Sequence, residues 1–182
     1  MRLFTGLDLS PEVAGRLADL VERLRPAARI AWSPPANLHI TTKFIGEWPE
    51  ERVEELQSAL AALGGRAPIA VHVGGLGFYP NPRSPRVFWC GVEAPGLAEL
   101  AGDTDAATAR LGIESEKRAY SAHLTLARIR EPVDLRVLHE RIAALGTVDL
   151  GRFEARSFFL YRSQLRPGGS LYTKLAEFPL SK

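Results

Sequence analysis

A short pattern, His-x-Thr, occurs twice in this chain and constrains its fold more than any other feature. Residues 39–41 read His-Ile-Thr and residues 123–125 read His-Leu-Thr, 84 positions further along a chain of 182 residues. Each copy lies in an apolar, strand-like run, and residues i and i+2 of a strand point to the same face. Each copy therefore presents an imidazole and a hydroxyl on one face and an aliphatic side chain on the other.

The elements predicted around the two copies follow the same order in each half of the chain. Each half gives a strand, a helix, the motif strand, a second helix and further strands. This order favours an α+β fold of two pseudo-symmetric lobes, each a small, mostly antiparallel sheet backed by helices, within a single domain of residues 1–182. We predict helices over 11–25, 49–63, 97–111 and 135–145, and strands over 2–9, 37–45, 69–73, 76–79, 86–92, 122–129, 152–162 and 170–178.

The duplicated order also predicts where the two motifs meet. If the lobes pack about a pseudo-two-fold axis, both motif strands lie at that axis and line a central cleft with the two histidine–threonine pairs. The chain has two further histidines, His72 in a strand-like run and His139 in a helix-like run, and neither belongs to a copy of the motif. We predict that both are structural or solvent-facing.

Composition bounds the class of protein. The formal net charge is only +2, and the single cysteine, Cys90, excludes an intramolecular disulfide. Cys90 lies in an apolar strand-like run, which predicts a buried and inert thiol. No apolar run is long enough to span a membrane and no signal-peptide pattern opens the chain, so we expect a cytoplasmic monomer without membrane contacts. Arginine supplies most of the basic charge, which suits phosphate binding but is explained equally well by coding bias.

The paired imidazoles and hydroxyls favour one kind of chemistry over its rivals. A catalytic zinc site usually needs three protein ligands, and no cluster of His, Cys, Asp or Glu completes one here, so we predict no metal. No nucleophile elbow, phosphate-binding glycine loop or dinucleotide fingerprint occurs, so we predict no cofactor either. Acid–base catalysis on a phosphodiester fits best, because one imidazole can take a proton while the other gives one, and hydroxyls can bind phosphate oxygens.

Longer stretches around the motifs resemble a known family. The chain resembles the 2H phosphoesterase superfamily and, within it, the RNA 2′,3′-cyclic phosphodiesterases, also called 2′-5′ RNA ligase-like proteins. The resemblance covers nearly the whole chain and is carried by residues 32–47, 78–83, 85–89 and 123–128, and by Ser163-Gln164-Leu165, Gly168-Gly169 and Tyr172.

The resemblance implies a function and a site. It implies hydrolysis of a 2′,3′-cyclic phosphate at an RNA end to a 2′-phosphate. The acid–base chemistry above needs no metal, and small cyclic nucleotides are the other substrates that we expect. By motif position, His39 and His123 become the acid–base pair, and Thr41, Thr125 and Arg128 become phosphate ligands. Two alternatives stay open: a 2′-5′ RNA ligase that joins tRNA halves, and a non-catalytic RNA-binding module.

Arg128 and the aromatic residues are less constrained by the sequence. In a regular strand Arg128 would face away from His123, because the offset between them is odd. A bulge or strand end before it would restore the functional orientation, and a structural salt bridge is the other possibility. Trp32, Phe44 and Tyr79 are candidates to stack on a nucleobase, and each is equally compatible with a place in the core.

Overall fold

The computed structural model describes residues 1–182 and contains two antiparallel sheets covered by four α-helices. Sheet A has the strand order β3-β1-β8-β9 and sheet B the order β2-β6-β5-β4-β7. The strands are β1 (Arg2–Leu7), β2 (Ala31–Trp32), β3 (Ile40–Glu47), β4 (Ile69–Tyr79), β5 (Val87–Glu93), β6 (His123–Arg128), β7 (Asp149–Ala155), β8 (Ser157–Arg166) and β9 (Gly169–Pro179). The helices are α1 (Pro11–Leu24), α2 (Val53–Ala61), α3 (Leu97–Ala109) and α4 (Arg136–Leu145), with 3₁₀ turns η1 (Arg25–Ala27), η2 (Pro35–Asn37) and η3 (Glu50–Arg52).

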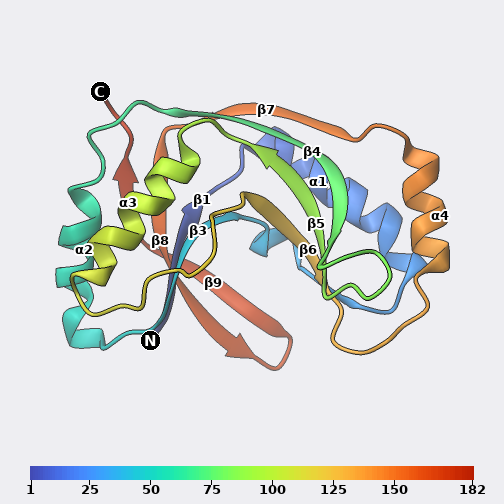
Figure 1. Cartoon of the computed structure of the whole chain (residues 1–182), viewed down its shortest axis with the longest axis horizontal. Coiled ribbons are helices and arrows are strands. Elements are labelled where there is room, and N and C mark those ends of the chain that lie inside the picture. The colour runs from blue at the N-terminus through green and yellow to red at the C-terminus, as the bar shows by residue number, and fades with distance from the viewer.

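The predicted two-lobed α+β fold is confirmed, but the lobes are not the two halves of the chain. β1 and β3 from the first half form sheet A with β8 and β9 from the end of the chain. β4, also from the first half, leaves them and pairs with β5 in sheet B. The helices are exchanged in the same way. α3 from the second half lies with α2 on sheet A, and α1 from the first half lies with α4 over sheet B (Figure 1). Each half of the chain therefore completes the sheet of the other half.

Two predicted strand boundaries were wrong, for the same reason. The predicted strand over 152–162 is two strands, β7 and β8, that belong to different sheets and are separated by Arg156 alone. The predicted break between 73 and 76 is instead a register shift inside the continuous strand β4. Local alternation shows that a segment is extended, but the partner strand decides where it bends or changes sheet.

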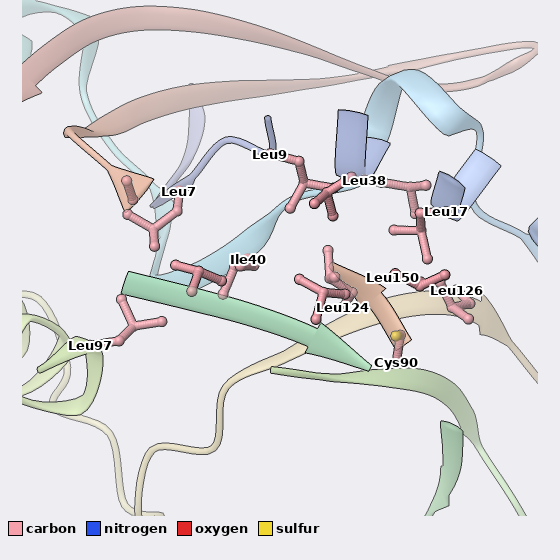
Figure 2. Packing of buried hydrophobic residues seen from close by; sticks show 14 of the residues in the cluster. Leu7, Leu9, Leu17, Leu38, Ile40, Cys90, Leu97, Leu124, Leu126 and Leu150 are labelled. Carbon is pink, nitrogen blue, oxygen red and sulfur yellow. The ribbon is translucent and has the colours of Figure 1, made fainter. Parts of the chain in front are cut away.

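The middle residue of each motif fixes the orientation of its neighbours. Ile40 and Leu124 have no exposed surface and belong to one continuous core beneath both sheets. Figure 2 shows both side chains among the leucines of this interior. Because strand side chains alternate between faces, burial of these two residues directs the flanking histidines and threonines to the opposite face. No helix in the structure is both long enough and apolar enough to cross a membrane.

Candidate active site

Both motif strands carry a bulge at the same place, three residues after the histidine. In β3 the pairing with β1 skips Thr42, and in β6 the pairing with β5 skips Leu126. A bulge adds one residue to one strand and so reverses the face of every residue after it. Arg128 consequently lies on the same face as His123, exposed and without a salt bridge. The bulge resolves the odd offset in favour of the orientation that a phosphate ligand needs.

The His39 ring is held at both nitrogens. Its Nδ1 lies 2.6 Å from the carbonyl oxygen of Asn37, and its Nε2 lies 2.9 Å from the hydroxyl oxygen of Thr41. A carbonyl can only accept, so Nδ1 carries the hydrogen, and in the neutral ring Nε2 then accepts from Thr41. The turn η2 that presents Asn37 is itself fixed, because the Asn37 side-chain amide donates to the carbonyl of Ser170 at 2.7 Å.

An aromatic cluster encloses the same ring. The ring centroids of Phe4, Tyr172 and Tyr161 lie 4.6, 5.2 and 5.9 Å from that of His39. Burial lowers the pKa of His39 below its usual value, and the Asn37 carbonyl opposes that shift only in part. His39 is therefore a neutral ring at neutral pH, and its Nε2 lone pair accepts from Thr41.

His123 has the opposite surroundings. Its Nδ1 donates to the carbonyl oxygen of Ser121 at 2.8 Å, which copies the anchor of His39, but the side chain is exposed and Nε2 makes no hydrogen bond within the protein. Ser33, which follows the edge strand β2, supports the bulge beside His123. Its hydroxyl donates to the Thr125 carbonyl at 2.9 Å, and its amide donates to the carbonyl of Leu126 at 2.8 Å.

Several contacts bring the two motifs together. Strands β3 and β6 are neighbours in space although they belong to different sheets. The Tyr120 hydroxyl, just before β6, donates to the Thr41 carbonyl at 2.8 Å. The positive charges of Arg128 and His123 each lower the pKa of His39, which places both groups within electrostatic range of its ring. Two imidazoles, two threonines and one free guanidinium thus share one region.

The residues set aside at the sequence level lie elsewhere. His72 joins Asp149 and Glu93 at the surface of sheet B, with its Nε2 3.0 Å from Asp149 Oδ1. His139 packs from α4 against Phe78. Cys90 is fully buried, and burial raises its pKa to about 12, so its thiol is protonated and unreactive. The predictions for all three are confirmed.

Sequence reasoning missed the groups that surround His39. Phe4, Tyr161 and Tyr172 come from three strands, and only Tyr172 carried a signal, as part of the resemblance. Asp8 was missed as well: its charge raises the pKa of both His39 and Tyr161, and its carboxylate forms an ion pair with Lys174. The buried Tyr161 hydroxyl is the one buried side-chain polar atom without a hydrogen-bond partner.

Comparisons with known proteins give consistent results. A sequence model of the family described as LigT like Phosphoesterase matches residues 7–89 and 91–172. The chain is 32% identical to a protein of Methanothermobacter thermautotrophicus named RNA 2′,3′-cyclic phosphodiesterase, over 99% of both sequences. It superposes on TT0787 of Thermus thermophilus with a TM-score of 0.84 and 32% identity, over 99% of this chain and 98% of that one. The structure of E. coli LigT complexed with 3′-AMP gives a TM-score of 0.75 and 26% identity over 100% and 98% of the two chains.

Proposed function

The chain belongs to the LigT-like phosphoesterases of the 2H superfamily, and from this premise we propose that it hydrolyses 2′,3′-cyclic phosphates at RNA ends to 2′-phosphates. Full-length relatives named RNA 2′,3′-cyclic phosphodiesterase support a phosphodiesterase activity. The observation that carries the proposal is that two His–Thr pairs from separate sheets meet beside an unpaired arginine. Small cyclic nucleotides present the same strained ring and are the simplest substrates.

The proposed reaction uses both histidines, His39 and His123, in one turnover. A water oxygen attacks phosphorus, one neutral imidazole takes the water proton, the bond from phosphorus to O3′ breaks, and the other, protonated imidazole gives its proton to O3′. Each ring is anchored through Nδ1 on a backbone carbonyl, so Nε2 is the atom that exchanges the proton. Each acid–base role contributes about 10²–10⁴-fold to the rate.

The remaining groups bind the phosphate in this proposal. The Thr41 and Thr125 hydroxyls and the Arg128 guanidinium donate to the nonbridging oxygens, where negative charge increases in the transition state. The Thr41 hydroxyl has one hydrogen, so it binds phosphate either by turning that hydrogen from the neutral His39 ring to a phosphate oxygen, or by accepting from Nε2–H when His39 is protonated.

The proposal includes no metal and no cofactor. Water activation and leaving-group protonation are both assigned to imidazoles, which leaves no step for a Lewis acid. In support, the structure has no group of three or more His, Cys, Asp or Glu side chains arranged to hold a metal ion. We further propose that residues 1–182 act as one domain and as a cytoplasmic monomer, and the single core that both sheets share supports the first of these.

A direct test is the hydrolysis of adenosine 2′,3′-cyclic phosphate in the presence of EDTA, with the product identified by chromatography. We expect adenosine 2′-phosphate and undiminished activity in the chelator. His72→Ala is the matched control, because its ring lies in a surface ion pair away from the motifs. A 3′-phosphate product, or loss of activity on chelation that added metal restores, would contradict the proposal.

A further inference from the structure

Lys43 is the one charged residue among the buried residues of the chain. It follows the bulge of β3, where the next residue, Phe44, pairs with Phe4 on the cleft face. Lys43 therefore points to the opposite face of sheet A, where α3 packs on β3. Its Nζ lies 2.7 Å from Asp105 Oδ1 of that helix, and only 2% of the side chain is exposed.

The other two partners of this ammonium group belong to the segment 110–122, which connects α3 with β6. Nζ donates to the Glu114 carbonyl oxygen at 2.7 Å and lies 3.5 Å from a carboxylate oxygen of Glu116. Asp105 joins the same network, because its Oδ1 accepts from the Glu116 amide at 3.0 Å. One buried cation thus attaches both the helix and the segment to the motif strand β3.

The attached segment leads directly to the second motif. It contains no helix or strand and runs from the helix layer of sheet A to β6 in sheet B (Figure 1). Near its end, the Tyr120 hydroxyl donates to the Thr41 carbonyl at 2.8 Å, and the Ser121 carbonyl accepts from His123 Nδ1 at 2.8 Å. That carbonyl is the only hydrogen-bond partner of the His123 ring within the protein. The orientation of His123 therefore depends on the path of the segment.

A buried ion pair contributes little to stability, because the cost of removing both charges from water offsets most of their attraction. A long irregular segment, in contrast, has many conformations to lose, and a tether near its middle restricts them. We propose that Lys43 is a positioning residue, which fixes the 110–122 segment and thereby the orientation of His123 relative to His39. Its effect on the rate rests on the proposed function, whereas its effect on the ring rests on the geometry alone.

The first experiment observes the ring without turnover. Long-range proton–nitrogen NMR at about pH 8.5, where imidazoles are neutral, distinguishes a hydrogen on Nδ1 from one on Nε2. We expect His123 of the wild type to carry its hydrogen on Nδ1, where Ser121 accepts it, and to populate both tautomers in Lys43→Met. Its signals are assigned by their absence in His123→Ala.

The other motif provides the internal control for these spectra. His39 donates Nδ1–H to the Asn37 carbonyl, which lies outside the 110–122 segment, so this ring should keep its tautomer in Lys43→Met. A His123 ring that also keeps its Nδ1–H tautomer in Lys43→Met would overturn the proposal.

The second experiment measures kcat on adenosine 2′,3′-cyclic phosphate. Because displacement of a reacting group by about 1 Å can cost about 100-fold, we expect Lys43→Met to lower kcat by up to that factor. In the His123→Ala background the same substitution should cause little further loss. Equal losses in the two backgrounds would show that Lys43 does not act through His123 and would overturn the proposal.

Arg66→Met is the matched control for this measurement. It breaks a partly buried ion pair with Asp103 of the same helix, α3, and none of the hydrogen bonds of Arg66 reaches the 110–122 segment. The control should therefore keep the wild-type kcat. A loss of kcat in Arg66→Met as large as that in Lys43→Met would assign both effects to general destabilisation.

A double variant separates positioning from stability. Lys43→Met combined with Asp105→Leu removes both buried charges, so urea unfolding should show a more stable protein than Lys43→Met alone. The segment stays detached, because Glu114 and Glu116 have lost their anchors, and kcat should remain as low as in Lys43→Met. A kcat that recovers together with the stability would assign Lys43 a structural role and overturn the proposal.

The two proposals fail in different ways. If the wild-type protein does not hydrolyse the cyclic phosphate, the proposed function is wrong, and the NMR spectra alone then decide whether Lys43 orients His123. If hydrolysis proceeds but neither the tautomer of His123 nor kcat depends on Lys43, the function stands and the positioning role is excluded.

Discussion

The two His–Thr motifs have the same backbone and different surroundings. Both histidines donate Nδ1–H to the carbonyl two residues before them, and both strands have a bulge one residue after the threonine. Yet His39 is enclosed by three aromatic rings and bonded to Thr41, whereas His123 is exposed with a free Nε2. The shared backbone thus fixes where the rings lie, and the packing around His39 lowers the pKa of that ring.

The strongest test of this comparison removes the rings one at a time and together. We expect His39→Ala and His123→Ala each to lower kcat/KM on adenosine 2′,3′-cyclic phosphate by about 10²–10⁴-fold. Because both rings act in one turnover, the loss of kcat/KM in the double variant should be only slightly larger than the loss in the less active of the two single variants. Multiplied losses in the double variant would show that the two motifs act independently.

The two motifs also differ in the residue that lies five positions after each histidine. Phe44 and Arg128 occupy equivalent places, five residues after their histidines, and both are exposed. Loss of a charged hydrogen bond to phosphate predicts that Arg128→Leu reduces kcat/KM about 10–100-fold. The matched control is Arg110→Leu, which removes an exposed arginine at the C-cap of α3 and should stay within about twofold of wild type. Similar losses in the two variants would contradict the assignment of Arg128 to the phosphate.

The contact between the motif strands should appear in stability. Tyr120→Phe removes the hydrogen bond from its hydroxyl to the Thr41 carbonyl, at a cost of about 1 kcal/mol in the free energy of unfolding. Urea unfolding measures this difference. Tyr79→Phe is the control. Its hydroxyl accepts a hydrogen bond from Arg118 in an exposed position, so its loss should hardly change the free energy of unfolding. Equal stability of Tyr120→Phe and the wild type would show that this bond does not hold the strands together.

The smallest expected effect is a pH dependence of stability that arises from His39. Its folded pKa lies below 6.5, so as the pH falls through that value the unfolded chain takes up a proton that the folded chain does not. The free energy of unfolding then falls by at most about 1.4 kcal/mol for each pH unit, until the ring is protonated in the folded protein as well. His39→Gln removes this dependence. In urea unfolding, the free energy of unfolding of the variant should therefore rise relative to that of the wild type below about pH 6.5, and the difference between them should be constant above it. A constant difference at every pH would contradict the assignment.

The parts of the site that follow from local pattern were predictable. The motif strands, the faces of their side chains and the buried Ile40 and Leu124 all come from alternation in short segments. The orientation of Arg128 was not predictable, because a bulge depends on the register with β5 and leaves no mark in the sequence of β6. The exchange of strands between the lobes could not be predicted for the same reason, because β7 and β8 form one continuous strand-like segment in the sequence.

The environment of His39 was also beyond local reasoning. Its aromatic neighbours Phe4, Tyr161 and Tyr172 are separated by most of the chain and meet only because β1 lies beside β8, and β8 beside β9. The packing of Trp89 on Gly77 was hidden in the same way, because it becomes visible only once β4 and β5 are paired.

The exchange of β4 and β8 between the sheets has a consequence for how such a chain can arise. Two copies of a half-chain, each placing one strand in the sheet of the other, would make a closed dimer with both motifs at the two-fold axis. In that dimer the two histidines would be chemically identical, because one gene would encode both. Fusion of the copies into one chain lets each motif acquire its own neighbours. A symmetric dimer of identical half-chains could not provide the contrast between a buried His39 and an exposed His123, which a single chain can encode.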